Sequence, residues 1–135
     1  MRIVLDSNVI ISGALAPEGV PGKIVAAWRE ARFDLVTSLA QLEEIGRVLA
    51  YPKIRSRLKW DDERIGQFLR QLYLRAEIVE LSGAQTELPR DAGDAHILAC
   101  LVEAKADLLV TGDNDLLALR KRHPIETPAE FVKRL

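Results

Sequence analysis

Short apolar runs alternate along this chain with longer stretches whose apolar residues recur at helical spacing. The short runs predict buried strands at residues 2–6, 33–38, 77–81 and 107–111 and around Ile125. The longer stretches predict helices at residues 9–16, 23–32, 39–50, 61–75, 95–106 and 116–122, a short helix or turn at 53–59, and a last helix after Thr127. Apolar strands separated by helices are typical of a parallel sheet that is covered on both faces. The pattern predicts an α/β fold, namely a three-layer α/β/α sandwich with a central, mainly parallel sheet of four to five strands.

Polar residues mark the places where several helices begin. Two pairs have the spacing of a capping box: Ser38 with Gln41, and Thr127 with Glu130. Asp61 stands where it caps the helix that follows it. Residues 82–90 are polar and predict a loop. No repeat, low-complexity tract or linker divides the chain, so residues 1–135 are expected to form one domain.

The composition excludes several classes of protein. Hydrophobic residues make up 48% and charged residues 29% of the 135 residues, which is typical of a globular domain rather than a disordered chain. No apolar run reaches the roughly 18 residues that a membrane span needs. The first apolar run contains Asp6 and lacks a small-residue cleavage site, so we expect no signal peptide. The single cysteine, Cys100, lies in an apolar helix pattern, so we expect no disulfide framework and a reducing, cytoplasmic location.

Charge is distributed unevenly along the chain, although the formal net charge is only −1. Residues 47–75 contain eight basic and three acidic side chains, a net charge of +5, which leaves −6 on the remainder. Such segregation can produce a basic surface beside an acidic site. Ordinary solvated helix faces would give the same pattern, so both interpretations stay open.

Acidic residues lie near the predicted carboxyl edge of the sheet, which is where open α/β sheets hold their sites. Asp6 ends the first strand, and Asp113 follows the fourth strand by one glycine. Asp94 precedes the helix that leads to that strand, where the helix dipole favours an ionised carboxylate. Glu43 and Glu44 lie on the helix after the second strand. Each acid alone could be a cap, a turn residue or part of a solvated pair, but their joint placement favours a site.

Carboxylates that converge in one crevice repel each other unless a cation lies among them. Oxygen ligands suit Mg²⁺ or Mn²⁺, and such an ion can activate a water and stabilise the leaving oxygen of a phosphodiester. His96 and His123 do not have the spacing of metal ligands, and an isolated helix histidine such as His96 is more often a packing or surface residue. The sequence also lacks the Cys/His spacing of a zinc site, a Gly-rich phosphate loop and a serine nucleophile elbow.

Three stretches together resemble PIN domains, in the branch of toxin components related to VapC toxins: LDSNVIISGAL, TSLAQLEEIGRVLAYPK and DAGDAHILACLVEAKADLLVTGDNDLL. The resemblance covers essentially the whole chain, and the joint pattern is specific although each motif alone is weak. It implies a PIN-like α/β/α fold, a Mg²⁺- or Mn²⁺-dependent endoribonuclease and a site of four acids. It also implies an RNA substrate, a cognate antitoxin protein and a homodimer.

By this resemblance, four acids are the catalytic and metal-binding residues: Asp6, Glu44, Asp94 and Asp113. Three further residues match supporting positions: Asn8, Thr111 and Asp115. The candidates for contacting the RNA backbone come from the basic segment: Lys53, Arg55, Arg57 and Lys59. The choice of Glu44 over Glu43 rests on the resemblance only, because both flank the apolar stripe of their helix almost symmetrically. Gly46, which weakens that helix, departs from the family pattern, and Asp91 is interpreted as a loop or cap residue.

Two alternatives to an active nuclease remain open. Asp6 at the end of the first strand also suits a phosphotransfer domain, but a haloacid-type phosphatase needs a second aspartate where this chain has Asn8, and a receiver needs a lysine after its last strand. The run from Asp113 to Asp115 is similar to part of a topoisomerase-primase core, although that core begins with a glutamate. The other alternative is an inactive PIN fold that only binds nucleic acid or protein, which the retention of all four acids disfavours.

Overall fold

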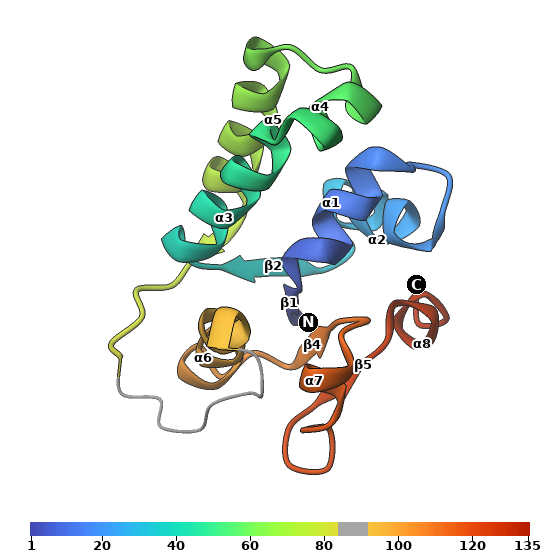
Figure 1. The fold of residues 1–135 in the computed structure, drawn as a ribbon. Helices are drawn as coiled ribbons and strands as arrows, with labels where there is room; N and C mark the ends of the chain where they lie inside the picture. The colour runs from blue at the N-terminus through green and yellow to red at the C-terminus, as the bar shows by residue number, and fades with distance from the viewer. Residues whose placement is uncertain (84–91) are drawn as a thin grey trace.

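The chain folds around a parallel sheet of five strands in the order β3-β2-β1-β4-β5, as seen in a computed structural model that describes residues 1–83 and 92–135 (Figure 1). The strands are β1 (Arg2–Leu5), β2 (Asp34–Thr37), β3 (Glu77–Ile78), β4 (Leu108–Val110) and β5 (Ile125–Glu126). Every pairing between them is parallel. The predicted α/β/α architecture with a central parallel sheet is therefore confirmed.

Helices cover both faces of this sheet. They are α1 (Ser7–Leu15), α2 (Val20–Arg29), α3 (Leu39–Ala50), α4 (Pro52–Leu58), α5 (Asp62–Arg75), α6 (Ala95–Glu103), α7 (Asn114–Leu117) and α8 (Pro128–Val132), with a 3-10 turn, η1 (Ala92–Asp94), before α6. Helices α1 to α5 lie on one side of the sheet, and α6 and α7 lie on the other (Figure 1). This arrangement gives the three layers.

Two hydrophobic cores result from the alternation of side chains along each strand. In β1, Ile3 and Leu5 pack into the core beneath α1, α2, α3 and α5. Val4, which points to the opposite face, packs with Leu98 of α6 and Leu109 of β4 in the second core. Cys100 also lies in the second core, and burial raises the pKa of its thiol to about 12. A strand with both faces buried has to be apolar throughout, which is the pattern that the sequence shows.

The start of α3 differs from the predicted capping box. The Ser38 hydroxyl accepts a hydrogen bond from the backbone N–H of Gln41 at 3.2 Å, as a cap should. The Gln41 side chain does not return the bond to Ser38. Its amide nitrogen instead donates to the carbonyl oxygen of Leu5 at 2.6 Å, and its amide oxygen accepts from the Thr37 hydroxyl. This buried glutamine therefore ties α3 to the ends of β1 and β2, close to the carboxyl edge of the sheet.

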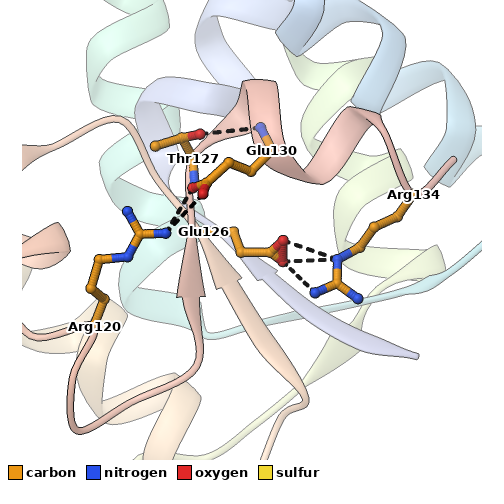
Figure 2. A network of polar contacts seen from close by, with 5 residues as sticks. All are labelled: Arg120, Glu126, Thr127, Glu130 and Arg134. Atoms are coloured by element: carbon orange, nitrogen blue, oxygen red, sulfur yellow. Dashed lines mark hydrogen bonds and ion pairs between the residues drawn. The ribbon is translucent and has the colours of Figure 1, made fainter.

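The start of α8 has the complete capping box that the sequence predicts. The Thr127 hydroxyl accepts from the backbone N–H of Glu130 at 3.1 Å, and the Glu130 carboxylate accepts from the backbone N–H of Thr127 at 2.9 Å. Figure 2 shows that Arg120 also binds Glu130, and that Arg134 binds both carboxylate oxygens of Glu126. These pairs hold α8 against β5 at the edge of the sheet.

Some predicted element bounds are wrong for local reasons. The predicted helix at 95–106 ends at Glu103, because Lys105 adopts a left-handed conformation with φ of 51°. The predicted helix at 116–122 is α7 instead, and it begins earlier because the Asp113 side chain caps it at the Asp115 N–H. Strand β3 has two residues rather than five. Asp91 and residues 84–90 of the predicted loop lie outside the described residues.

None of the described helices alone is long and apolar enough to cross a membrane. The pair α1 and α2 meets that test by length and composition only when taken together, across a bend of 98°.

Candidate active site

The candidate site begins where β1 and β4 end side by side. Leu5 is paired with Val110, and the backbone N–H of Asp6 donates to the Val110 carbonyl at 2.9 Å. This register places Asp6 beside Thr111, and the Thr111 hydroxyl donates a hydrogen bond to Asp6 Oδ2 at 2.6 Å. Both side chains are buried, with Asp6 4% and Thr111 0% exposed. Two residues that are 105 positions apart in sequence therefore form one fixed pair at the carboxyl edge.

Asp113 continues this chain of hydrogen bonds. Its backbone N–H donates to the Thr111 hydroxyl oxygen at 3.0 Å, so that hydroxyl both donates to Asp6 and accepts from Asp113. One Asp113 carboxylate oxygen accepts the backbone N–H of Asp115 at 2.8 Å and thereby begins α7. Thr111 and Asp115 thus each form a hydrogen bond with the side chain of one of the two acids. Asp113 combines the role of a cap with a place beside Asp6.

The charge on Asp6 is unfavourable in this environment. Burial of the carboxyl raises its pKa above the ordinary value, and the nearby charges of Asp113 and Glu44 raise it further. The hydrogen bond from Thr111 and the backbone N–H of Asn8 act in the opposite direction. The Asn8 side chain is exposed. A cation near Asp6 would favour its ionised form.

Glu44 faces the start of α6, where it meets a residue that sequence reasoning set aside. His96 Nε2 lies 2.8 Å from Glu44 Oε2, and the side chains are only 19% and 28% exposed. Glu43 is exposed and lies on a different face of α3. The two glutamates that periodicity could not separate therefore have different surroundings. The only sequence signal for His96 is its position two residues after Asp94.

Asp94 lies in η1, at the N-terminal end of α6. Its side chain makes no capping hydrogen bond to that helix, and its Oδ2 atom is buried. Because His96 on the first turn of α6 contacts Glu44, the start of α6 is brought to the side of α3 that carries this glutamate. The site thus draws on the end of β1, on α3, on the start of α6 and on the turn after β4.

The donor atoms suit a hard divalent cation, but they are not gathered around one point. Among residues 1–83 and 92–135, no group of three or more His, Cys, Asp or Glu side chains is close enough to hold a metal ion. Asp6 nevertheless experiences the charges of both Asp113 and Glu44. Carboxylate oxygens are the ligands that Mg²⁺ and Mn²⁺ prefer, so the chemistry of the donor set fits such an ion. Binding would require the acidic side chains to draw closer together.

The basic residues of the predicted RNA-binding surface lie on α4 and just after it. Arg55 forms an ion pair with Asp62 at 2.7 Å, so its charge is already partly satisfied. Lys53, Arg57 and Lys59 are exposed. Helix α4 follows the C-terminal end of α3, away from α6 (Figure 1). These residues are therefore outside the acidic site itself.

Comparison with known proteins identifies the family of this chain. The model of a PIN domain family matches residues 2–115, a span that contains Asp6, Glu44, Asp94 and Asp113. The chain is a member of the PIN domain family. Proteins of this family are generally nucleases, and the nucleases among them usually use a divalent metal.

Two known proteins show how far the similarity extends. This PIN domain is 30% identical to an uncharacterised protein of Methanocaldococcus jannaschii, across 98% of this chain and 90% of that protein. It also shares its fold with a chain in the crystal structure of VapBC2 from Rickettsia felis bound to a DNA fragment from their promoter. The TM-score is 0.56 at 17% identity, and the match covers 94% of this chain and 98% of the other.

Replacement of Asp6 by Asn is expected to stabilise the metal-free fold at neutral pH. The reason is the raised pKa of Asp6, since a buried carboxyl of this kind opposes folding once it is ionised. Below the unfolded pKa the carboxyl is protonated in both states, and the two proteins should be equally stable. The difference in free energy of unfolding between Asp6→Asn and the wild type should grow as the pH rises from the pKa of Asp6 in the unfolded chain to its higher pKa in the folded chain. Urea unfolding of both proteins between pH 3 and 7, in the presence of a chelator, measures this difference in stability.

The exposed substitution Glu63→Gln is a suitable control for this experiment, because Glu63 lies on the outer surface of α5. An Asp6→Asn variant that is less stable than the wild type at pH 7 would contradict the stated electrostatic environment.

Proposed function

We propose that this PIN domain is a Mg²⁺- or Mn²⁺-dependent endoribonuclease whose catalytic and metal-binding residues are Asp6, Glu44, Asp94 and Asp113. The observation that carries the proposal is the buried Asp6 carboxylate, whose pKa is raised by burial and by the charges of Asp113 and Glu44. A cluster of this kind at the carboxyl edge of a parallel sheet suits a divalent cation. When bound, such an ion activates a water and stabilises the charge that develops on a phosphodiester.

The chain's own residues hold the acids in place for this reaction. Thr111 fixes one oxygen of Asp6 and, through its own oxygen, the backbone of Asp113. The hydrogen bond from the backbone N–H of Asp115 to the Asp113 carboxylate limits the rotation of the Asp113 side chain. Asp6 and Asp113 are thus each oriented by a hydrogen-bond partner before a substrate arrives.

We assign the RNA backbone contacts to Lys53, Arg57 and Lys59, with Arg55 in a lesser role because it already pairs with Asp62. Exposed basic side chains bind phosphates without reading sequence, and they release counterions when they do so. Binding through this surface should therefore weaken as the salt concentration rises.

We further propose that the protein acts in the cytoplasm as the toxin of a toxin–antitoxin pair and associates with itself and with a cognate antitoxin. Two observations support this: membership in the PIN family, and a shared fold with a chain from the VapBC2 crystal structure. Induced expression should arrest growth, and the Asp94→Asn variant expressed to the same level should not. Arrest by both proteins would separate toxicity from the proposed site.

Incubation of the purified protein with labelled single-stranded RNA tests the enzymatic proposal. We expect internal cleavage with Mn²⁺ or Mg²⁺ and none with chelator. Parallel reactions with single-stranded DNA of the same sequence test the preference for RNA. Formation of an acyl phosphate on Asp6 with a phosphodonor, in the absence of RNA cleavage, would instead favour phosphotransfer.

Removal of the His96 imidazole is expected to lower the affinity of the site for the metal ion by about 10- to 100-fold, which is the usual effect of losing a residue that orients a metal ligand. His96 Nε2 lies 2.8 Å from Glu44 Oε2, so we propose that His96 is a positioning residue that orients Glu44. The His96→Ala variant should require more Mn²⁺ for half-maximal activity, whereas His96→Gln keeps a side-chain N–H donor and should fall between the two. An unchanged Mn²⁺ requirement in His96→Ala would show that this contact has no part in metal binding.

A further inference from the structure

A basic groove lies where α1 and α2 meet α4 and α5, on the side of the sheet that all four helices cover (Figure 1). It consists of two adjoining hollows with volumes of about 370 and 280 Å³. The larger hollow is within the range of about 300 to 1,000 Å³ that is typical of pockets for small molecules. None of the four proposed catalytic acids lines either hollow, so the groove is separate from the candidate active site. The residues that line both hollows are Arg29, Trp60, Arg64 and Phe68.

Three arginines reach this basic groove from three different helices. Arg29 ends α2, Arg57 lies on α4 and Arg64 lies on α5. No aspartate or glutamate is among the described residues that line the two hollows. None of the three arginines forms an ion pair in the part of the chain that the structure describes. Positive charges that share one groove repel each other, so an anion bound among them would be stabilised.

Aromatic rings hold two of these guanidinium groups in place. The Cζ atom of Arg64 lies 4.7 Å from the centre of the Trp60 ring, and that of Arg29 lies 5.8 Å from the centre of the Phe68 ring. The two rings also pack edge to face, with their centres 5.5 Å apart. A guanidinium group stacked on a ring keeps its N–H donors at its edge, where they can bind two oxygens of one phosphate. The groove therefore presents preorganised donors to a phosphate group.

The rest of the larger hollow is apolar. An inorganic phosphate ion would leave this surface unused. A nucleotide would use it, because a base packs its flat face against apolar and aromatic side chains while its phosphate binds arginine. The combination of three arginines with an apolar wall therefore favours a nucleotide over a simple anion. The apolar side chains of the hollow, apart from the two rings, are Ala14, Leu15, Pro17, Val25, Ala26 and Leu58.

We propose that this basic groove binds a nucleoside monophosphate, with the phosphate on the three arginines and the base against Trp60 and the apolar wall. The proposal goes beyond the proposed nuclease reaction, because it needs neither the metal ion nor an RNA substrate. Its test therefore uses no activity measurement. Arg57 is also one of the residues that we assign to RNA backbone contacts, so the test relies on Arg29 and Arg64.

Calorimetric titration in chelator at low salt, with adenosine monophosphate, adenosine and inorganic phosphate, tests the proposal. Adenosine monophosphate should bind at least about tenfold more tightly than either of the others, because each lacks one half of the ligand. Arg29→Gln and Arg64→Gln should each weaken its binding by at least about tenfold, through the loss of a charge-assisted hydrogen bond. Arg70→Gln removes the same charge from an exposed position on α5 outside the groove, and it should bind like the wild type.

Melting curves give a second measurement that recognises a misfolded variant by its missing transition. Adenosine monophosphate should raise the melting temperature of the wild type and of Arg70→Gln more than that of the two groove variants. Absence of binding by the folded wild type at millimolar nucleotide would overturn the proposal, as would equal affinity in all four proteins. Inorganic phosphate that binds as tightly as the nucleotide would overturn the assignment of a nucleotide. Binding of polyglutamate instead of the nucleotide would assign the groove to an acidic protein segment and also overturn it.

Discussion

Asn in place of Asp6 is expected to lower the rate of RNA cleavage by at least about 100-fold, since losing even a residue that orients a metal ligand costs about 10- to 100-fold. Asp6 is the most buried of the proposed acids and the one that experiences the charges of two others. Asn has nearly the same shape and can still accept the hydrogen bond from Thr111, but it supplies no negative charge for a divalent cation. The measurement is the single-turnover rate of cleavage of a labelled RNA with saturating Mn²⁺.

Stability measurements separate this effect from damage to the fold. The same Asn variant is expected to be more stable than the wild type at neutral pH, so lost activity together with a raised melting temperature assigns Asp6 to function rather than to folding. Glu43→Gln is the matched control, because it removes a carboxylate from the residue next to Glu44 but on a different face of α3. Its activity should equal that of the wild type. Cleavage that survives Asp6→Asn would remove Asp6 from the proposed site.

Removal of divalent cations is expected to abolish cleavage, and added Mn²⁺ is expected to restore it. The acids that surround Asp6 then have no counter-charge, and their mutual repulsion keeps them apart. Mn²⁺ at about 100 times its dissociation constant should also stabilise the wild-type fold by about 2.7 kcal/mol. Melting temperatures in a Mn²⁺ titration measure this effect independently of activity, with ionic strength held constant by KCl.

The acidic variants define the specificity of that stabilisation. Asp94→Asn should show a smaller Mn²⁺-dependent rise in melting temperature than the wild type, whereas Glu63→Gln should show the same rise. Full cleavage in the presence of chelator would contradict a metal-dependent reaction, even if Mn²⁺ stabilised the protein.

The sequence predicts the architecture well because buried parallel strands are apolar on both faces. The runs at β1, β2 and β4 are of this kind, and each residue of β1 from Ile3 to Leu5 has a core to enter. The order of the strands does not follow from such runs, because it depends on which helices cross which face. Gln41 illustrates the same point on a smaller scale. Its spacing predicts a capping box, but its side chain reaches the Leu5 carbonyl, a contact that exists only once β1 and α3 are packed together.

Part of the candidate site follows from a simple rule, since residues that end neighbouring parallel strands meet at one edge. The rule brings Asp6 next to the segment that holds Thr111 and Asp113, and the hydrogen bonds between them agree with it. It does not distinguish Glu44 from Glu43. His96 could not be assigned a role from its own position in the sequence, because it contacts Glu44, which lies 52 positions earlier on a different helix.

The most direct test of the central claim compares four proteins on one single-stranded RNA with Mn²⁺: the wild type, Asp6→Asn, Asp94→Asn and Glu43→Gln. We predict internal cleavage by the wild type and by Glu43→Gln, and none above background by either Asn variant. Equal cleavage by all four proteins would contradict the proposed site, and the absence of cleavage by the folded, Mn²⁺-loaded wild type would contradict the proposed reaction.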